Sequence, residues 1–261
     1  MNLRVSVLSK VGGRERNEDA CGHWSNPAGA FCCVLSDGAG GHAGGDVASR
    51  VAVDLVLRSF AGRPQCASTR VAGLIAEANR EVMLQQSRDV RLSDMRATLV
   101  VLVCDQVAGQ AVWGHIGDSR LYCLRGGFVL GQTKDHSLYQ SMVDAGFADP
   151  ARARGHPDRN VLTGSLGSED GLVPDVLASP FSLQEGDAFL LCSDGFWDLL
   201  EEAQIEAALQ RALTPDDWLA ELERIIVTGL RRGSDNYSAI AVWFGTPDFS
   251  TRIAPPRSPR L

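Results

Sequence analysis

The sequence lacks several features that would assign it to other classes of protein. No apolar run reaches the roughly 18 residues that a membrane-spanning helix requires, and Arg4 and Lys10 interrupt the only early apolar stretch, which argues against a signal peptide. The 25 basic side chains are outnumbered by 32 acidic ones, giving a net charge of −7, so a basic surface for nucleic acid is not expected. We therefore expect a soluble protein with neither a nucleic-acid nor a membrane partner.

Lysine and paired cysteines are also scarce. The lysines are Lys10 and Lys134, and neither lies in a G-x-x-x-x-G-K-[ST] loop, so an ordinary nucleotide triphosphatase is not expected. The seven cysteines are odd in number, form no C-x-x-C pair and lie mostly within apolar runs. Buried free thiols in a reducing cytoplasm explain this pattern best.

The hydrophobic pattern predicts more strands than helices. Two helices are expected between the early strands and one near the end, where Thr214 and Pro215 form a favourable N-terminus. A short helix is expected at about 137–145. The expected strands cover residues 3–8, 31–36, 97–104, 109–116, 119–125, 187–192 and 237–244, and the long helices cover residues 43–60, 68–88 and 215–231.

The helices cluster instead of alternating with the strands, which argues against a Rossmann-type sheet. Several strands are apolar on both faces, so both of their faces should be covered. The 261 residues are enough for one large domain. We expect a single domain over residues 1–245 with two strand groups, each covered by a helix pair, a surface insertion at about 135–165, and a disordered Pro/Arg-rich tail over residues 246–261.

Aspartates recur where apolar strands begin or end. Two close apolar strands and precede glycine, one occupies a turn between strands, and two precede strand-like runs; they are Asp37, Asp194, Asp118, Asp235 and Asp19. Each alone is ordinary turn chemistry. Together they predict a cluster of carboxylates at one rim of the sheets, where sites are commonly built.

Clustered carboxylates repel one another unless a cation neutralises them. Oxygen ligands without an accompanying His/Cys set favour Mg²⁺ or Mn²⁺ over Zn²⁺. Two such ions could activate a water for in-line attack on phosphorus. Arg14, just before Asn17-Glu18-Asp19, could bind phosphate oxygens in a bidentate manner. The residues therefore indicate a metal-assisted phosphoester hydrolase.

Six short motifs in one order extend this interpretation. Together they resemble the motif series of the metal-dependent protein phosphatases (the PPM family, or type 2C phosphatases) in their compact bacterial form, over about residues 3–245. The motifs are Arg14-x-x-Asn17-Glu18-Asp19, Asp37-Gly38-Ala39-Gly40-Gly41-His42-x-x-Gly45, Gly117-Asp118-Ser119-Arg120, Asp135-His136-Ser137, Ser193-Asp194-Gly195-Phe196-Trp197-Asp198 and Gly233-Ser234-Asp235-Asn236-Tyr237-Ser238.

The resemblance implies an α+β fold, a four-layer α-β-β-α sandwich with two antiparallel sheets packed face to face and helices outside. It also implies a two-metal site of Mn²⁺ or Mg²⁺ at one end of the sheets. The implied core ligands are Asp37, the carbonyl of Gly38, Asp194 and Asp235. Asp19 matches an acid that ligates a metal ion or orients its water. These four aspartates are the expected catalytic residues.

Further roles follow from the same resemblance. Asp118 and Asp198 match positions used for a third, weaker metal ion in similar enzymes. Arg14 matches the phosphate-binding arginine. Glu18 and Asn236 would support the metal ligands from behind. Residues 135–165 correspond to a flap that varies between members of the family.

The sequence departs from the family pattern after Asp37-Gly38. Ala39 stands where eukaryotic members have a histidine and bacterial members usually have a methionine. His42 lies three residues further on, and we expect it to support the loop more than to donate a proton. The other histidines, His115 and His136 among them, are expected to be structural.

The expected function is hydrolysis of phosphoserine and phosphothreonine in proteins. A C-x₅-R loop is absent, which excludes a cysteine nucleophile of the tyrosine-phosphatase kind. Two alternatives stay open: a pseudophosphatase that only binds or senses a partner, and a hydrolase of small phosphoesters. The expected partners are a Ser/Thr kinase or its substrates, and the expected state is a cytoplasmic monomer.

Overall fold

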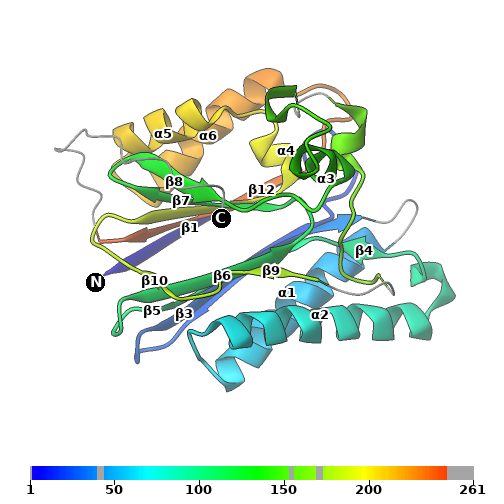
Figure 1. Cartoon of the computed structure of the whole chain (residues 1–261), viewed down its shortest axis with the longest axis horizontal. Helices are drawn as coiled ribbons and strands as arrows, with labels where there is room; N and C mark the ends of the chain where they lie inside the picture. The colour runs from blue at the N-terminus through cyan, green and yellow to red at the C-terminus, as the bar shows by residue number, and fades with distance from the viewer. Residues whose placement is uncertain (1, 40–43, 153–155, 169–172, 246–261) are drawn as a thin grey trace.

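The computed structural model describes residues 2–39, 44–152, 156–168 and 173–245. Two antiparallel sheets lie face to face, and helices cover the outer face of each one (Figure 1). This arrangement confirms the expected α+β sandwich of four layers. The proposed tail at 246–261 lies outside the described residues.

The first sheet has the strand order β1-β12-β11-β7-β8. At one edge of this sheet β1 pairs antiparallel with β12 along its whole length, so the first and last described strands lie side by side. The strands are β1 (Leu3–Lys10), β12 (Tyr237–Phe244), β11 (Ala188–Cys192), β7 (Arg120–Arg125) and β8 (Phe128–Gln132).

The second sheet has the order β10-β6-β5-β3-β2, with β4 beside β3 and β9 beside β6. The strands are β10 (Phe181–Ser182), β6 (Gln110–Ile116), β5 (Leu99–Asp105), β3 (Ala30–Ala39), β2 (Asp19–Ser25), β4 (Arg96–Ala97) and β9 (Asp175–Val176). β2 coincides with the short strand-like run that begins at Asp19 and was not among the expected strands, because it contains few apolar residues.

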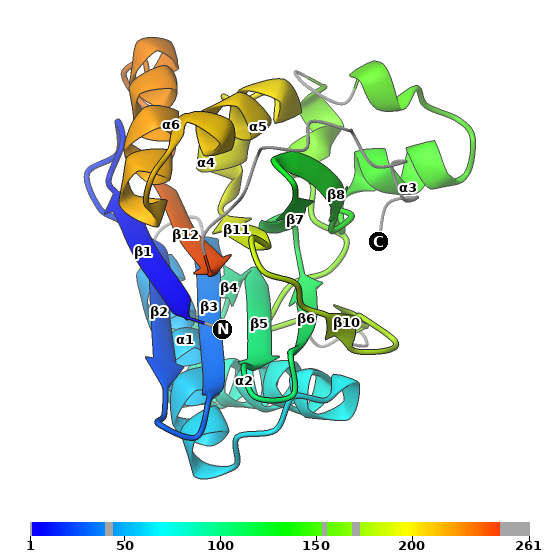
Figure 2. The ribbon, with the colours of Figure 1, turned by 90° about the vertical axis from the view of Figure 1, so that its left-hand side faces the viewer.

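Helices α1 (Gly45–Gly62) and α2 (Ser68–Arg88) pack on the second sheet, and α5 (Glu202–Arg211) and α6 (Pro215–Gly229) pack on the first (Figure 2). The Thr214 hydroxyl accepts a hydrogen bond from the Asp217 N–H at 3.1 Å, so the expected cap of α6 is present. Neither α5 nor β8 was expected. The remaining helices are α3 (Leu138–Asp144) and α4 (Asp194–Trp197).

Three apolar layers explain why several strands are apolar on both faces. Along β3, Cys33 and Leu35 pack between the two sheets, whereas Cys32 and Val34 pack against α1 and α2. This alternation follows from the two-residue period of a strand. A strand sandwiched between a sheet and helices therefore needs an apolar residue at every position.

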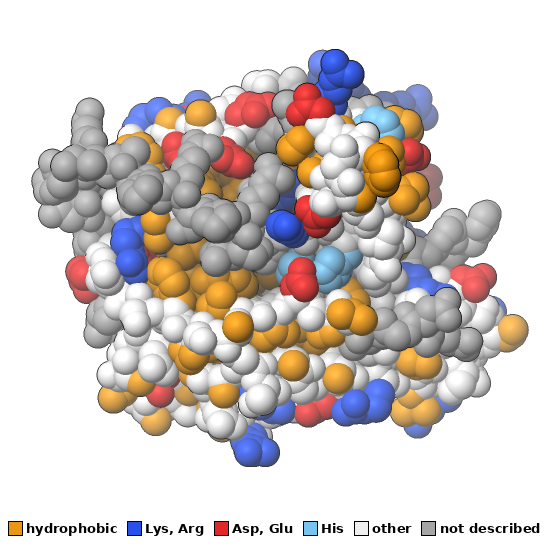
Figure 3. Space-filling model, in the orientation of Figure 1, with side chains coloured by type: hydrophobic (Ala, Val, Ile, Leu, Met, Phe, Trp, Pro, Cys, Tyr) orange, Lys and Arg blue, Asp and Glu red, His pale blue; other side chains and the backbone are white. Residues whose placement is uncertain are grey.

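Two aspects of the surface bear on function. Among the described residues, no helix has the length and hydropathy required to cross a membrane. On the face seen in Figure 3, basic side chains are interspersed with acidic ones, and hydrophobic side chains show along the edge between the sheets. The flap segment, with α3 and the 3₁₀ turn η3 (Pro157–Asn160), lies at the same end of the sandwich as α4 (Figure 1).

Candidate active site

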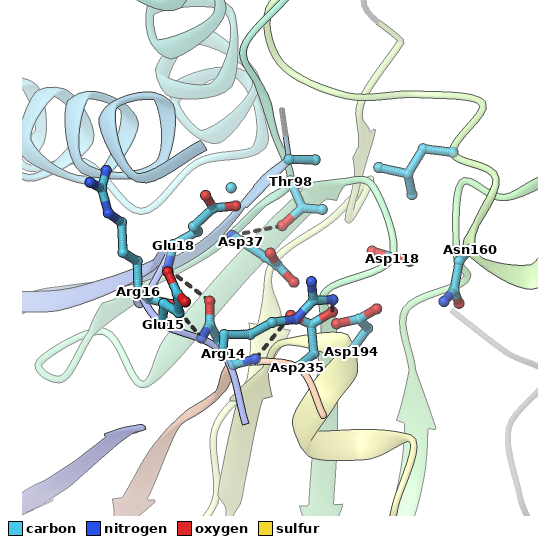
Figure 4. Close-up of a pocket in the computed structure, with 14 residues that line it drawn as sticks. Arg14, Glu15, Arg16, Glu18, Asp37, Thr98, Asp118, Asn160, Asp194 and Asp235 are labelled. Atoms are coloured by element: carbon cyan, nitrogen blue, oxygen red, sulfur yellow. Dashed lines mark hydrogen bonds and ion pairs between the residues drawn. The ribbon is translucent and has the colours of Figure 1, made fainter. Parts of the chain in front are cut away.

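A cavity of about 490 Å³ opens at this end of the two sheets. Four aspartates line it from four different elements: Asp37 from the end of β3, Asp118 from the turn between β6 and β7, Asp194 from the start of α4, and Asp235 from the residues before β12. In Figure 4 the side chains of Asp37, Asp194 and Asp235 point toward a common space. Segments far apart in the sequence thus converge on one acidic cavity.

The pairing of β2 with β3 places a fifth carboxylate beside them. Asp19 lies directly opposite Asp37 in the antiparallel register, so the two side chains share one face of the sheet. The Ser193 hydroxyl donates to Asp19 Oδ2 at 2.9 Å. Asp19 Oδ1 is buried and has no hydrogen-bond partner among the described residues. A buried carboxylate oxygen without a partner is costly unless a cation or water meets it.

A close backbone contact brings α1 to the cavity. Gly38 lines the cavity, and its N–H donates to the Glu18 carbonyl at 3.1 Å. A Cβ on Gly38 would lie 2.0 Å from the Gly45 carbonyl oxygen, so only glycine allows the first turn of α1 to approach β3. The Glu18 carboxylate packs against the same contact, because a Cβ on Gly45 would lie 2.7 Å from Glu18 Oε2.

Asn236 fixes the segment that carries Arg14. Its side-chain amide donates to the carbonyls of Val11 and Arg16, at 2.8 and 2.9 Å, and its Oδ1 accepts from the Glu18 N–H at 2.8 Å. Asn236 is 5% exposed, so these bonds are sheltered from water. The predicted supporting residue therefore holds the whole 11–18 segment rather than the Asp235 side chain alone.

Arg14 lies at the mouth of the cavity. Its Nη2 donates to Asp235 Oδ2 at 2.9 Å (Figure 4). Both side chains are about half exposed, so this ion pair is open to water and to a ligand. A guanidinium has five N–H groups, and the others can bind further oxygens.

The carboxylates of the cavity are difficult to ionise together. The pKa of Asp19 is raised to about 7, mainly by burial and also by the charges of Asp194 and Asp235, although hydrogen bonds from the Ser238 and Ser193 hydroxyls oppose the rise. The pKa of Asp37 is raised well above its usual range by burial and then by Asp19 and Asp194. Burial also raises the pKa of Asp194 and of Asp118. The cluster therefore stores repulsion that a bound cation would relieve.

These observations fit a divalent metal centre. The donors are carboxylate oxygens, the preferred ligands of Mg²⁺ and Mn²⁺, and the Asp19 Oδ1 atom is buried without a partner. Two arginines, Arg14 and Arg16, line the cavity among six carboxylates, and Arg14 forms an ion pair with Asp235. The site thus has more buried negative charge than its own side chains neutralise.

The turn that carries Asp118 is held by hydroxyl and imidazole groups. Thr98 Oγ1 accepts from the Asp37 N–H at 3.0 Å and contacts the Ser119 hydroxyl at 2.7 Å. His136 Nδ1 accepts from the Gly117 N–H at 3.3 Å. Thr98 lines the cavity and links the end of β3 to the turn that carries Asp118.

His115 and His136 form a second group of possible metal ligands with Asp175. Their rings are stacked, with centroids 4.7 Å apart. His115 Nε2 donates to the Lys134 carbonyl at 2.6 Å, and burial lowers the pKa of His115 to about 4. His136 Nε2 lies 3.3 Å from Asp175 Oδ2, and the structural role expected for both histidines stays a prediction.

Other predicted residues fall outside the cavity. Asp198 follows α4, does not line the cavity and pairs with Arg159 of η3. His42 lies outside the described residues. The flap contributes two cavity-lining residues that the sequence did not single out, Asn160 and Leu162. No local motif marks them, because they reach the cavity only through the fold of the insertion.

Comparison with known proteins places this arrangement in a family. Residues 9–226 match the family model described as protein phosphatase 2C. The chain therefore belongs to the protein phosphatase 2C family, the metal-dependent protein phosphatases that its motifs resemble.

Individual relatives agree over nearly the whole chain. The serine/threonine phosphatase stp of Listeria innocua is 32% identical over 236 residues, which cover 88% of this chain and 90% of that protein. The solved serine/threonine phosphatase of S. agalactiae has 27% identity and a TM-score of 0.81, covering 93% of this chain and 100% of that one. The catalytic domain of the phosphatase PstP, solved in complex with two manganese ions, has 27% identity and a TM-score of 0.77, covering 94% and 99%.

Proposed function

We propose that this chain is a protein serine/threonine phosphatase that hydrolyses phosphoserine and phosphothreonine at a binuclear Mn²⁺ or Mg²⁺ centre. The observation that carries the proposal is the convergence of carboxylates from separate elements on one cavity beside Arg14. Family membership and the relatives named serine/threonine phosphatases support it.

The residues proposed to hold the two ions are Asp37, the Gly38 carbonyl, Asp194 and Asp235, with Asp19 behind them. When bound, the ions supply an activated water and neutralise charge on the phosphoryl group. The relative that was solved with two manganese ions supports this number. Asp19 would ligate an ion or orient its water, because its Oδ1 has no hydrogen-bond partner within the described part of the chain.

Arg14 is proposed to bind the phosphate. Its contact with Asp235 uses one N–H of the fork, so the remaining N–H groups can donate to phosphate oxygens. Asn236 keeps this arginine in place by holding the carbonyls on both sides of it. Binding and orientation of the phosphoryl group would then depend on the 11–18 segment.

The wider setting is also a proposal. We propose that residues 1–245 form one catalytic domain, that the enzyme acts as a cytoplasmic monomer, and that its substrates are a Ser/Thr kinase or the proteins which that kinase phosphorylates. All seven cysteines lie in the described ranges and are free thiols, which supports a reducing compartment. The net charge of −7 disfavours nucleic acid as a partner.

The test is phosphate release from a phosphothreonine peptide. The full chain is assayed in EDTA and then with Mn²⁺ or Mg²⁺, beside Asp194→Asn and the matched control Asp54→Asn, an exposed aspartate of α1. We expect metal to restore release in the wild type and in Asp54→Asn, but not in Asp194→Asn. No release from the folded wild type with either metal would overturn the proposal.

A further inference from the structure

Asp198 lies close to the proposed metal ligands but faces another partner. Its N–H donates to the Asp194 carbonyl at 2.9 Å, one helical turn back. Residues four apart on a helical turn lie on the same side. Asp198 nevertheless stays out of the cavity that Asp194 lines. Its carboxylate is turned to the flap instead.

The partner is Arg159 of η3. Arg159 Nη2 donates to Asp198 Oδ2 at 2.7 Å, and Arg159 Nη1 contacts Asp198 Oδ1, so both carboxylate oxygens are engaged by one guanidinium. The two side chains are 19% and 27% exposed, and the guanidinium lies 5.9 Å from the centre of the Trp197 ring. A bidentate pair sheltered in this way is stronger than an exposed ion pair.

This contact does not fit a third metal ion at Asp198. Guanidinium keeps its charge at any ordinary pH, and it already neutralises the carboxylate. A divalent ion at Asp198 would first have to displace Arg159. The family pattern suggests Asp118 and Asp198 as joint ligands of a third metal ion. In this chain the two side chains face different surroundings, because Asp118 lines the cavity, whereas Asp198 binds Arg159 of the flap.

The same contact fixes one wall of the cavity. Asn160 and Leu162, which follow Arg159 closely in sequence, line the cavity. Leu162 pairs with Ser137, and the Leu138 N–H donates to the Val161 carbonyl at 2.8 Å, so the segment is also joined to the start of α3. In Figure 4, Asn160 lies beyond Asp118 when viewed from Arg14. Arg159 thus connects this wall to α4, which begins with Asp194.

We propose that Arg159, instead of a third metal ion, is the cation that neutralises Asp198, and that this ion pair holds flap residues 156–162 as a wall of the active cavity. Arg159 is then a positioning residue for the phosphorylated substrate. Only the effect on substrate binding rests on the proposed phosphatase function. The ion pair and its effect on the flap can be tested without turnover.

The first test uses amide hydrogen exchange and metal counting on the full chain. The variants are Arg159→Ala, Asp198→Asn, their double variant, Arg159→Lys, and the control Arg152→Ala, an exposed arginine of the same flap. We expect exchange over residues 156–162 to accelerate about tenfold in both single variants and no further in the double variant. Arg159→Lys should be intermediate and the control unchanged.

Metal counting decides whether Arg159 or a third metal ion neutralises Asp198. The number of Mn²⁺ ions bound per chain, measured by equilibrium dialysis, should be the same in Asp198→Asn as in the wild type. One ion fewer in Asp198→Asn would overturn the proposal, and so would unchanged exchange over residues 156–162 in Arg159→Ala.

Kinetics supply the third readout. With a phosphothreonine peptide, Arg159→Ala and Asp198→Asn should raise KM several-fold and leave kcat near that of the wild type, and Arg159→Lys should recover part of the loss. A lower kcat at unchanged KM would contradict the positioning role. If the wild type itself releases no phosphate, the proposed function is wrong. Hydrogen exchange and metal counting would still show whether the Arg159–Asp198 ion pair holds residues 156–162.

Discussion

Altering a buried residue usually destabilises a protein, but the carboxylate cluster leads us to expect the opposite at Asp19. In metal-free protein, Asp19→Asn should raise stability although it removes a proposed catalytic residue. Asp19 is 8% exposed, its Oδ1 has no hydrogen-bond partner in the ranges that the structure describes, and neighbouring charges repel it. Removing its charge should therefore relieve more strain than the lost contacts cost.

The magnitude follows from the pKa. Because the pKa of Asp19 is raised from 3.8 to about 7, its charged carboxylate lowers the free energy of unfolding by roughly 4 kcal/mol near pH 7.5. The asparagine amide would place an NH₂ group without a partner at the Oδ1 position, at a cost of roughly 1–3 kcal/mol. The net gain is roughly 1–3 kcal/mol, or a Tm higher by about 2–10 °C for a chain of this size.

The sign of the pH dependence is also fixed. Because the folded state binds the Asp19 proton more tightly than the unfolded state does, this group favours folding at low pH. That contribution should be lost as the pH rises from about 4 to about 7 and stay lost above it. The raised pKa values of Asp37, Asp118 and Asp194 act in the same direction.

The assay is thermal unfolding in EDTA at pH 5.5 and 7.5, with Asp54→Asn as the control. The Tm of the wild type should be lower at pH 7.5 than at pH 5.5. In Asp19→Asn the difference in Tm between the two pH values should be smaller. Added Mn²⁺ at a hundred times its dissociation constant should stabilise the wild type by about 3 kcal/mol and the variant by less. A lower Tm for Asp19→Asn than for the wild type in EDTA at pH 7.5 would refute the reasoning.

Three further variants test the proposed phosphate-binding arginine and two residues that hold the backbone around the site. Arg14→Ala should raise KM for a phosphopeptide at least tenfold, and an unchanged KM in initial-rate kinetics would place the phosphate-binding group elsewhere. Gly38→Ala should cost at least about 2 kcal/mol in urea unfolding, because the new Cβ would lie 2.0 Å from the Gly45 carbonyl oxygen; a loss below the error of the measurement would disprove that close contact. Asn236→Ala should cost about 2–3 kcal/mol in the same assay and also raise KM, since three hydrogen bonds to the 11–18 segment are lost; a stability loss with KM unchanged would separate Asn236 from Arg14.

Much of the fold could be predicted because strands buried on both faces have continuous apolar runs. The strand expected at 31–36 lies within β3, and the one expected at 237–244 coincides with β12. Elements with mixed composition were missed. In β2 most residues are only half-buried, and α5 begins with a Glu201 capping box that resembles an ordinary polar loop.

The sequence also indicated which residues are proposed to carry the chemistry. Asp37 and Asp194 each follow an apolar strand and precede glycine, and this local pattern is enough to expect them at one rim of the sheets. Asp235 and Arg14 were expected from local patterns too, and the family motifs place all four residues in a fixed order. These inferences depend on short stretches of chain, and short stretches are what a sequence displays directly.

Only the tertiary structure decided how these groups pair. Asp19 lies opposite Asp37 because of the register between β2 and β3, and Asp198 binds Arg159 from 39 residues away. Neither contact leaves a local pattern, because each depends on how separate segments pack around the three apolar layers. Strand pairing and packing thus decided that Asp198 faces the flap while Asp194, four residues earlier, faces the cavity.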